Sequence, residues 1–187
     1  FVFHRSESAL STDVASFLDD GEPPIVFTLG SSAVGAAGAF FRESVEAARR
    51  LGRRALLLVG RDPRNRSNLS LPKTMLVAEF AAHDLVFPRA AVVVHHGGIG
   101  TTAQALRSGR PMLVVPHAHD QPDNAYRARK LGVAQVIDAR HYTARRVLTA
   151  LGTLLEDRRH VAAATGIAGR LRREDGLARA VDALLTA

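Results

Sequence analysis

The chain has 187 residues, of which 47% are hydrophobic, so it can bury one hydrophobic core. It has no cysteine, which excludes disulfides and thiolate metal sites. Its formal net charge of +7 comes mainly from arginines spread among acidic residues, without a basic stripe interleaved with aromatic residues, which disfavours a nucleic-acid-binding domain. No apolar run approaches the roughly 20 residues of a membrane-spanning helix, and we expect a soluble, cytoplasmic protein.

The first 22 residues predict an interdomain linker with one short helix over 12–18, for which Ser11 is a suitable N-cap. Glycine and prolines end this segment and separate it from a single domain that we expect over 23–187. Because the chain begins at Phe1 rather than at methionine, we expect it to be a piece of a longer protein.

From residue 25 onward, short apolar runs alternate with amphipathic stretches. The apolar runs predict buried strands over 25–29, 55–60, 74–80, 91–94, 112–116 and 134–137. The amphipathic stretches predict helices over 37–51, 101–108, 122–131, 143–156, 158–171 and 174–186, with a short helix or turn over 81–90. Because the strands lack polar alternation and helices separate them, we expect a doubly wound, Rossmann-like α/β fold with a parallel sheet covered on both faces.

The stretch "HHGGIGT" over 95–101 joins a predicted strand to a predicted helix. Glycines at this point let the backbone approach a ligand, and the helix N-terminus offers unpaired N–H groups and a partial positive charge. The stretch therefore indicates an anion site, with hydroxyls from Thr101 and Thr102; the alternative is a tight turn with no ligand. The spacing departs from both the nicotinamide fingerprint and the Walker loop, which disfavours a dehydrogenase.

A second polar loop, "HAHDQPDNA" over 117–125, follows the next strand and reaches the same edge of the sheet. A carboxylate and an amide beside a phosphate site suit a sugar diphosphate, because together they can bind vicinal hydroxyls. His117, His119 and Asp120 also raise the alternative of a metal site. On an extended segment, however, alternate side chains share one side and Asp120 points to the other, so we expect no metal.

Residues 92–133 resemble the donor-binding signature of family 1 glycosyltransferases of the GT-B fold, which include bacterial natural-product, rhamnolipid and sterol transferases. The resemblance rests on HHGG-x-GT, on G-x-P before a strand and on a DQ-x-x-NA block. The stretch "PPIVFTLGSSA" over 23–33 is similar to the first strand and Gly-Ser turn of the family's C-terminal domain. The resemblance therefore implies the C-terminal, nucleotide-sugar-binding half of a GT-B enzyme.

The resemblance also implies roles for individual residues. The residues expected at the donor diphosphate are His96, Gly98, Gly100, Thr101, Ser31 and Ser32. Those expected at the transferred sugar are Asp120 and Gln121, and those at the ribose and base are Gln104, Phe80, Ala81 and His83. The chain departs from the family where Gln104 replaces a common glutamate, Ala82 replaces proline and Phe80 replaces the tryptophan of plant relatives.

The implied function is that of the donor-binding domain of an inverting, metal-independent glycosyltransferase. Such an enzyme moves a sugar from a UDP- or dTDP-sugar to a hydroxyl of a small-molecule or lipid acceptor, and it needs no cofactor besides this donor. The general base and acceptor pocket are expected in an N-terminal domain before Phe1, so we expect the chain alone to be inactive. A non-catalytic nucleotide-sugar-binding module, an epimerase-type protein of the same fold and a basic nucleic-acid-binding domain stay open as alternatives.

The remaining histidines and the last helix carry weaker expectations. His95 is expected to pack in the core, since neighbours on a strand point to opposite faces, while His4, His141 and His160 are expected at the surface. The segment over 175–185 has one apolar face. The resemblance implies that this face contacts the N-terminal domain; the alternative is local packing.

Overall fold

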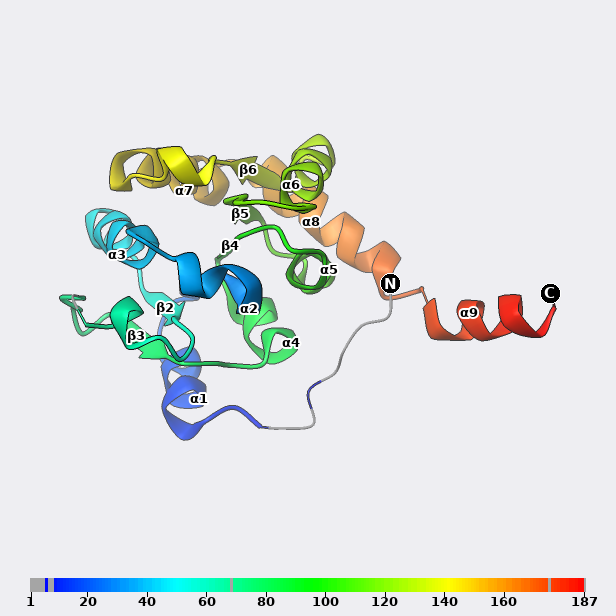
Figure 1. Cartoon of the computed structure of the whole chain (residues 1–187), viewed down its shortest axis with the longest axis horizontal. Helices are drawn as coiled ribbons and strands as arrows, with labels where there is room; N and C mark the ends of the chain where they lie inside the picture. The colour runs from blue at the N-terminus through cyan, green and yellow to red at the C-terminus, as the bar shows by residue number, and fades with distance from the viewer. Residues whose placement is uncertain (1–5, 7–8, 68, 175, 187) are drawn as a thin grey trace.

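The computed structural model describes residues 6, 9–67, 69–174 and 176–186; the side chains of residues 31, 32 and 36 lie outside this description. In the described part, six parallel strands form one sheet in the order β3-β2-β1-β4-β5-β6 (Figure 1). The strands are β1 (Ile25–Thr28), β2 (Ala55–Leu58), β3 (Met75–Ala78), β4 (Val92–His95), β5 (Met112–Val114) and β6 (Ala134–Val136). The predicted doubly wound α/β fold is confirmed, with most strands shorter than predicted.

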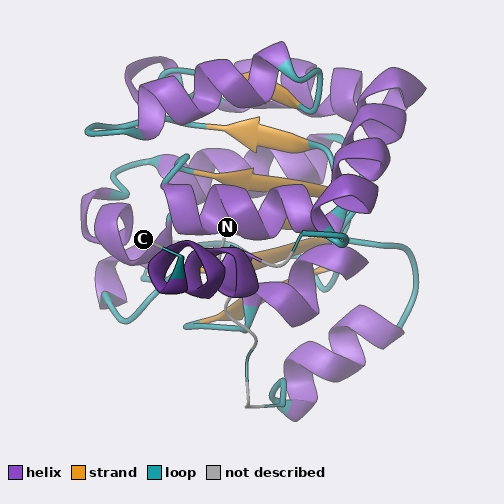
Figure 2. Ribbon diagram, turned by 90° about the vertical axis from the view of Figure 1, so that its right-hand side faces the viewer, coloured by secondary structure: helices purple, strands orange, loops and turns teal. Residues whose placement is uncertain are grey.

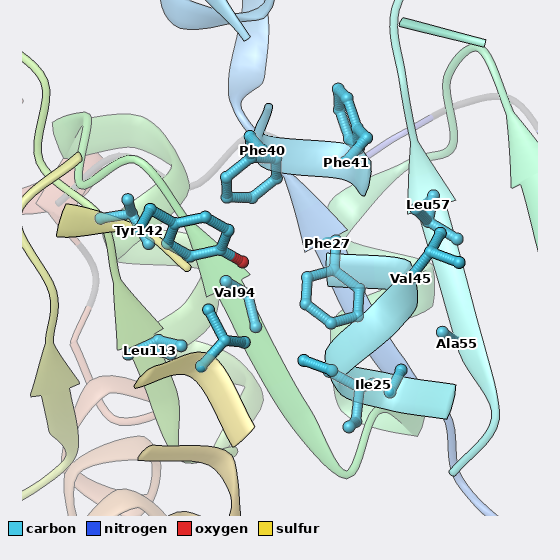
Figure 3. Close-up of a cluster of buried hydrophobic side chains, with 14 of the residues drawn as sticks. Ile25, Phe27, Phe40, Phe41, Val45, Ala55, Leu57, Val94, Leu113 and Tyr142 are labelled. Carbon is cyan, nitrogen blue, oxygen red and sulfur yellow. The ribbon is translucent and has the colours of Figure 1, made fainter. Parts of the chain in front are cut away.

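Both faces of the sheet are covered, which explains why the strands lack polar alternation. In β1, Ile25 and Phe27 belong to one hydrophobic cluster, whereas Val26 belongs to the other and pairs in register with Val93 of β4. Figure 3 shows part of the first cluster, in which the ring of Tyr142 stacks on Phe40 with 4.7 Å between centroids. The two clusters fix the side to which each strand residue points.

Helices form a layer on each side of the sheet (Figure 2). One side carries α3 (Phe40–Arg50) and α7 (Ala144–Glu156), whose apolar residues complete the first cluster. Residues that complete the second cluster come from α1 (Thr12–Asp19), α4 (His83–Val86), α5 (Ile99–Ser108), α6 (Gln121–Lys130) and α8 (Arg158–Leu171). The helices were predicted within a few residues of these bounds.

The short helix of the predicted linker is packed into the domain. Val14 and Leu18 of α1 are buried in the second cluster, and Arg54 lies over the ring of Phe17 at 4.1 Å from its centroid. An ion pair between Asp19 and Arg89 adds a polar contact to the same packing. The described residues 9–22 thus belong to the packed body, and the linker role of 1–22 stays a prediction.

Several short helical turns lie in the connections between the longer elements. The connection after β1 contains α2 (Gly30–Ala33), followed by η1 (Val34–Ala36). The other single turns of 3-10 helix are η2 (Pro63–Asn65), η3 (Phe87–Arg89) and η4 (Ala139–His141). These turns belong to the connections between strands and helices and do not form part of the helix layers.

The C-terminal helix α9 (Gly176–Leu185) extends away from the body of the domain (Figure 1). None of its described residues is buried, and Leu177, Val181, Leu184 and Leu185 are all exposed. The alternative prediction, that the apolar face of α9 packs locally against the domain, is therefore wrong for this structure. Among the described helices, none is long and apolar enough to cross a membrane.

Two surface histidines can be compared with the prediction, whereas His4 lies outside the described residues. His141 is exposed, as predicted. His160 lies half-buried at the surface, and its Nδ1 donates to the carbonyl oxygen of Gly132 at 2.7 Å, a contact that the sequence did not predict. The reason is that α8 lies against the turn between α6 and β6, a contact between distant segments.

Candidate functional site

The order of the strands reverses between β1 and β4, and this switch point is where open α/β sheets bind ligands. His96 and the glycine turn, defined as Gly97 and Gly98, follow β4 at this point and lead into α5. The imidazole of His96 lies close to Gly30, the residue that opens α2 beyond β1: a Cβ atom built on Gly30 would be 2.6 Å from its Cε1. The structure therefore brings the β1 and β4 connections together around His96.

The two adjacent histidines point in different directions. His95 is fully buried, and its Nδ1 accepts a hydrogen bond from the N–H of Gly97 at 3.1 Å, which confirms its predicted packing role. His96 is buried at the edge of the sheet, and burial together with the nearby His117 lowers its pKa to about 4, against the opposing effect of Asp120. At pH 7 the ring of His96 is therefore neutral, with one N–H donor and one acceptor nitrogen.

The first turn of α5 offers backbone donors that have no partner within the helix and no side-chain cap among the described residues. Its first intrahelical bond runs from the N–H of Thr102 to the carbonyl of Gly98 at 2.9 Å. The N–H groups of Ile99, Gly100 and Thr101 precede that bond, at the positive end of the helix dipole. These donors suit an anion at the sheet edge.

Gly100 differs from the two glycines of the glycine turn. A Cβ atom on Gly97 would lie 2.9 Å from Val114, and one on Gly98 would lie 2.4 Å from Nε2 of His96. A Cβ atom on Gly100 would meet no described atom within 4 Å, so packing within the chain does not require glycine there. The open space over the first turn of α5 leaves room for a ligand to contact the backbone.

The two threonines at this turn differ in availability. Thr102 is buried, and its hydroxyl donates to the carbonyl of Gly98 at 3.0 Å, so the predicted availability of this hydroxyl to a ligand is wrong. Thr101 is half-buried. Ser31 and Ser32 lie in α2, but their side chains are outside the description, so their predicted contacts cannot be placed.

The loop between β5 and α6 presents a carboxylate beside the glycine turn. Asp120 is exposed at the N-terminus of α6, and its side chain caps no backbone N–H of the helix. The residue before it, His119, has φ +59°, a backbone region that costs energy for residues other than glycine and is often found at binding sites. The Asp120 carboxylate therefore points outward from a sharply bent loop.

The amide of Gln121 closes this loop. Gln121 is buried, and its Oε1 accepts hydrogen bonds from the backbone N–H groups of His117 at 2.8 Å and of Ala118 at 3.1 Å. Its oxygen is therefore occupied by the loop itself, which the sequence did not reveal. The predicted contact of Gln121 with a sugar is left to its amide nitrogen.

Sequence reasoning gave no role to Asn124, one helical turn after Asp120. Its Nδ2 donates to the carbonyl oxygen of Gly97 at 2.9 Å and to Oδ2 of Asp120 at 2.7 Å. The available signal was the spacing, since residues four apart on a helix share a face. Asn124 connects the glycine turn to the exposed carboxylate.

The predicted base-binding segment lies beyond β3. Phe80 is 76% exposed, whereas Ala81 is buried in the second hydrophobic cluster and has only its backbone to offer a ligand. The His83 ring stacks on Phe87 with 4.4 Å between centroids, and burial, with a smaller effect of nearby His96, lowers its pKa to about 4. The predicted ribose contact, Gln104, is half-buried on α5.

Two cavities are lined by residues other than those of the glycine turn. One of about 290 Å³ lies between the connections that follow β1, β5 and β6, and it is lined by Phe40, His117 and Tyr142 among others. A larger one of about 530 Å³ lies between β6 and α7 and includes none of the predicted site residues. Among the described residues, no three His, Asp or Glu side chains are grouped so that they could hold a metal ion.

A family model described as the C-terminal domain of erythromycin biosynthesis protein CIII-like proteins matches residues 54–179. The chain belongs to this family. The match spans the glycine turn, the Asp120 loop and both flanking helices.

Relatives of this family member are named glycosyltransferases. It is 38% identical over 185 residues to the vancomycin aglycone glucosyltransferase of Amycolatopsis orientalis, with 97% of this chain and 43% of the relative covered. It is 44% identical over 124 residues to the O-mycaminosyltylonolide 6-deoxyallosyltransferase of Streptomyces fradiae, with 66% and 28% covered. The chain thus spans less than half the length of these curated relatives.

Solved structures agree with this assignment. The glycosyltransferase of kitacinnamycin superposes with a TM-score of 0.78 at 32% identity, over 88% of this chain and 42% of that one. The spinosyn rhamnosyltransferase SpnG complexed with thymidine diphosphate superposes with a TM-score of 0.78 at 26% identity, over 88% and 45%. The predicted membership of the family 1 glycosyltransferases and the predicted GT-B C-terminal fold are confirmed.

Proposed function

We propose that the chain is the donor-binding domain of a metal-independent, inverting glycosyltransferase and that its switch point binds a nucleoside diphosphate sugar. The observation that carries the proposal is the meeting of His96, the open first turn of α5 and Asp120 at one edge of the sheet. A neutral donor, free backbone N–H groups and a carboxylate match the two ends of a sugar diphosphate.

The diphosphate belongs over the first turn of α5. The backbone N–H groups near Gly98, Gly100 and Thr101 supply donors, and Gly100 leaves the space above them open. The neutral His96 ring adds one N–H donor at the same edge. Ser31 and Ser32 follow Gly30, which contacts His96, and this position supports their predicted role near the phosphates.

The sugar and the nucleoside lie on opposite sides of the diphosphate in this proposal. Asp120 accepts hydrogen bonds from sugar hydroxyls, and the amide nitrogen of Gln121 assists. The exposed ring of Phe80 stacks on the base, near His83 and the backbone of Ala81, and Gln104 faces the ribose. Structures of SpnG and of VinC that contain thymidine diphosphate, at 26% and 25% identity, support a dTDP-sugar as the first donor to test.

Glycosyl transfer follows from this placement. The oxygen of an acceptor hydroxyl attacks the anomeric carbon from the side opposite the diphosphate, the bond from that carbon to the phosphate oxygen breaks, and its electron pair stays on the phosphate. The acceptor proton passes to a general base that this proposal assigns to the part of the relatives' length that the chain does not span. His96 and the α5 N–H groups stabilise the charge that develops on the leaving diphosphate.

Calorimetric titration of the chain with UDP, dTDP and GDP and with their glucose conjugates, in the presence of EDTA, tests the proposal. We expect saturable binding of UDP or dTDP that His96→Ala abolishes and that His141→Ala, at an exposed position, leaves unchanged. Asp120→Ala should remove only the additional affinity given by the sugar. Absence of nucleotide binding, or loss of binding in EDTA, would contradict the proposal.

A further inference from the structure

Asn124 lies between the two ends of the proposed site, because its side chain hydrogen-bonds to the glycine turn and also to Asp120, one helical turn earlier on α6. Its Nδ2 donates to the carbonyl of Gly97 at 2.9 Å and to Oδ2 of Asp120 at 2.7 Å. A carbonyl and a carboxylate only accept, so the amide must present its NH₂ group to them, and its two N–H bonds satisfy both at once.

We propose that Asn124 is a positioning residue that holds the donor diphosphate site and the donor sugar site in one fixed relation. This inference rests on the proposed function. Asn124 touches no reacting atom in it; it acts through the glycine turn on one side and through Asp120 on the other.

The bond to Gly97 sets the direction of a donor in the diphosphate site. In a trans peptide the carbonyl and the following N–H point in opposite directions, so fixing the carbonyl of Gly97 toward Asn124 turns the N–H of Gly98 away from it. Gly97 also has φ +93°, which favours glycine, and it packs against Val114 and the backbone of Gln121. Packing thus restricts the conformation of the glycine turn, and the hydrogen bond from Asn124 fixes the direction of its Gly97 carbonyl.

The bond to Asp120 orders an exposed carboxylate before a ligand arrives. Asp120 is the N-cap residue of α6, but its side chain accepts no capping hydrogen bond from the helix backbone that would restrict its rotamers. Asn124 uses Oδ2, which leaves Oδ1 to accept hydrogen bonds from a sugar. Ordering the side chain in advance removes part of the entropy cost of binding and places the anomeric carbon consistently.

A double-mutant cycle separates this role from general stabilisation. Affinities for dTDP and for dTDP-glucose are measured by calorimetry on the folded chain and on Asn124→Ala, Asp120→Ala and the double variant. Asp123→Ala is the matched control, because the side chain of this neighbour on α6 forms an exposed ion pair with Arg127 and, among the described residues, no hydrogen bond to the site. Circular dichroism verifies that each variant is folded.

We expect Asn124→Ala to weaken dTDP about tenfold and to reduce the added affinity of the glucose moiety as well. In the Asp120→Ala background, the glucose contribution is already absent, so Asn124→Ala should then lower only the dTDP affinity. A purely structural residue would not produce this pattern. Full additivity of the two variants on the glucose contribution would overturn the inference.

Asn124→Asp keeps the size of the side chain and removes its donors, so it guards against a packing artefact in the alanine variant. It should weaken dTDP at least as much as Asn124→Ala, because it places a second carboxylate beside Asp120. Wild-type affinity in both Asn124 variants would overturn the positioning role while leaving the proposed function intact. If the unmodified chain binds UDP in place of dTDP, the same cycle is measured with UDP and UDP-glucose; failure to bind either nucleotide would overturn both.

Discussion

The imidazole of His96 occupies the space that a side chain on Gly98 would need, because a Cβ atom there would lie 2.4 Å from Nε2. Gly98 has φ −60° and ψ 143°, which any residue adopts, so the backbone does not require glycine. Glycine is needed at position 98 because the His96 ring leaves no room for a side chain there. The identity of one residue is therefore tied to the position of the other.

Gly98→Ala should for this reason destabilise the chain by about 1–3 kcal/mol, the usual range for overpacking. In a His96→Ala background the same substitution should cost little, since the clash is gone. Urea unfolding of the two single variants and the double variant gives the interaction energy. Equal effects of Gly98→Ala in both backgrounds would show that His96 is not the obstacle.

Gly100→Ala should separate stability from binding. Replacing a helical glycine in open space with alanine should raise the free energy of unfolding by about 0.5–1 kcal/mol. The added methyl group fills the space over the first turn of α5, so we expect weaker dTDP binding. Gly152→Ala in α7, where a Cβ atom likewise meets nothing within 4 Å, should match the gain in stability without the loss of affinity. A Gly100 variant with full affinity would exclude close approach of the ligand at this position.

Phe80→Ala tests the proposed base contact. The ring is 76% exposed, so its removal should change the free energy of unfolding by less than about 0.5 kcal/mol. Loss of stacking on the base should weaken dTDP about tenfold and leave inorganic pyrophosphate unaffected. Tyr126→Ala removes another exposed aromatic ring, on α6, and serves as the control. Parallel effects on dTDP and pyrophosphate would argue against stacking.

Two buried histidines, His95 and His96, and the half-buried His83 should make stability depend on pH. Burial, the largest cause, lowers the pKa of His83 and of His96 to about 4 and that of His95 to about 3, from an ordinary value of 6.5. The unfolded chain therefore binds protons below pH 6.5 that the folded chain does not bind. Stability is complete above pH 6.5 and falls as the pH drops toward 4, by up to about 1.4 kcal/mol per pH unit for each ring.

Urea unfolding at pH 7.5 and pH 5.5 measures this dependence. Aspartates paired with arginines, such as Asp138, have an ordinary pKa of 3.8, and the pairing lowers it further. Their protonation therefore changes the free energy of unfolding mainly below pH 5.5. His83→Gln should flatten the dependence, whereas His141→Gln, at an exposed position, should not. A free energy of unfolding that is equal at the two pH values would contradict the burial of these rings.

The sheet could be predicted because its strands are buried on both faces, so that runs such as residues 55–58 are apolar without interruption. The glycine turn could be located from its place between β4 and α5. The start of α5 was misplaced by two residues, because glycines at 98 and 100 lower helix propensity although tertiary packing allows the helix to begin at Ile99.

The internal bonds of the site could not be predicted in the same way. Asn124 and Gly97 are 27 residues apart, and their contact exists only because β4 and β5 are neighbours in the sheet. The Gln121 oxygen accepts hydrogen bonds from its own loop because the backbone bends at His119. The residue types of the loop do not predict this bend. Local patterns thus indicated which residues gather at the edge, while their partners required the folded chain.

A crystal structure of the chain with bound dTDP would show where the diphosphate lies. We expect it over the first turn of α5, with phosphate oxygens about 3 Å from the backbone nitrogens near Gly98 and Gly100 and from a ring nitrogen of His96. A diphosphate bound in the cavity between β6 and α7, away from the glycine turn, would contradict this expectation.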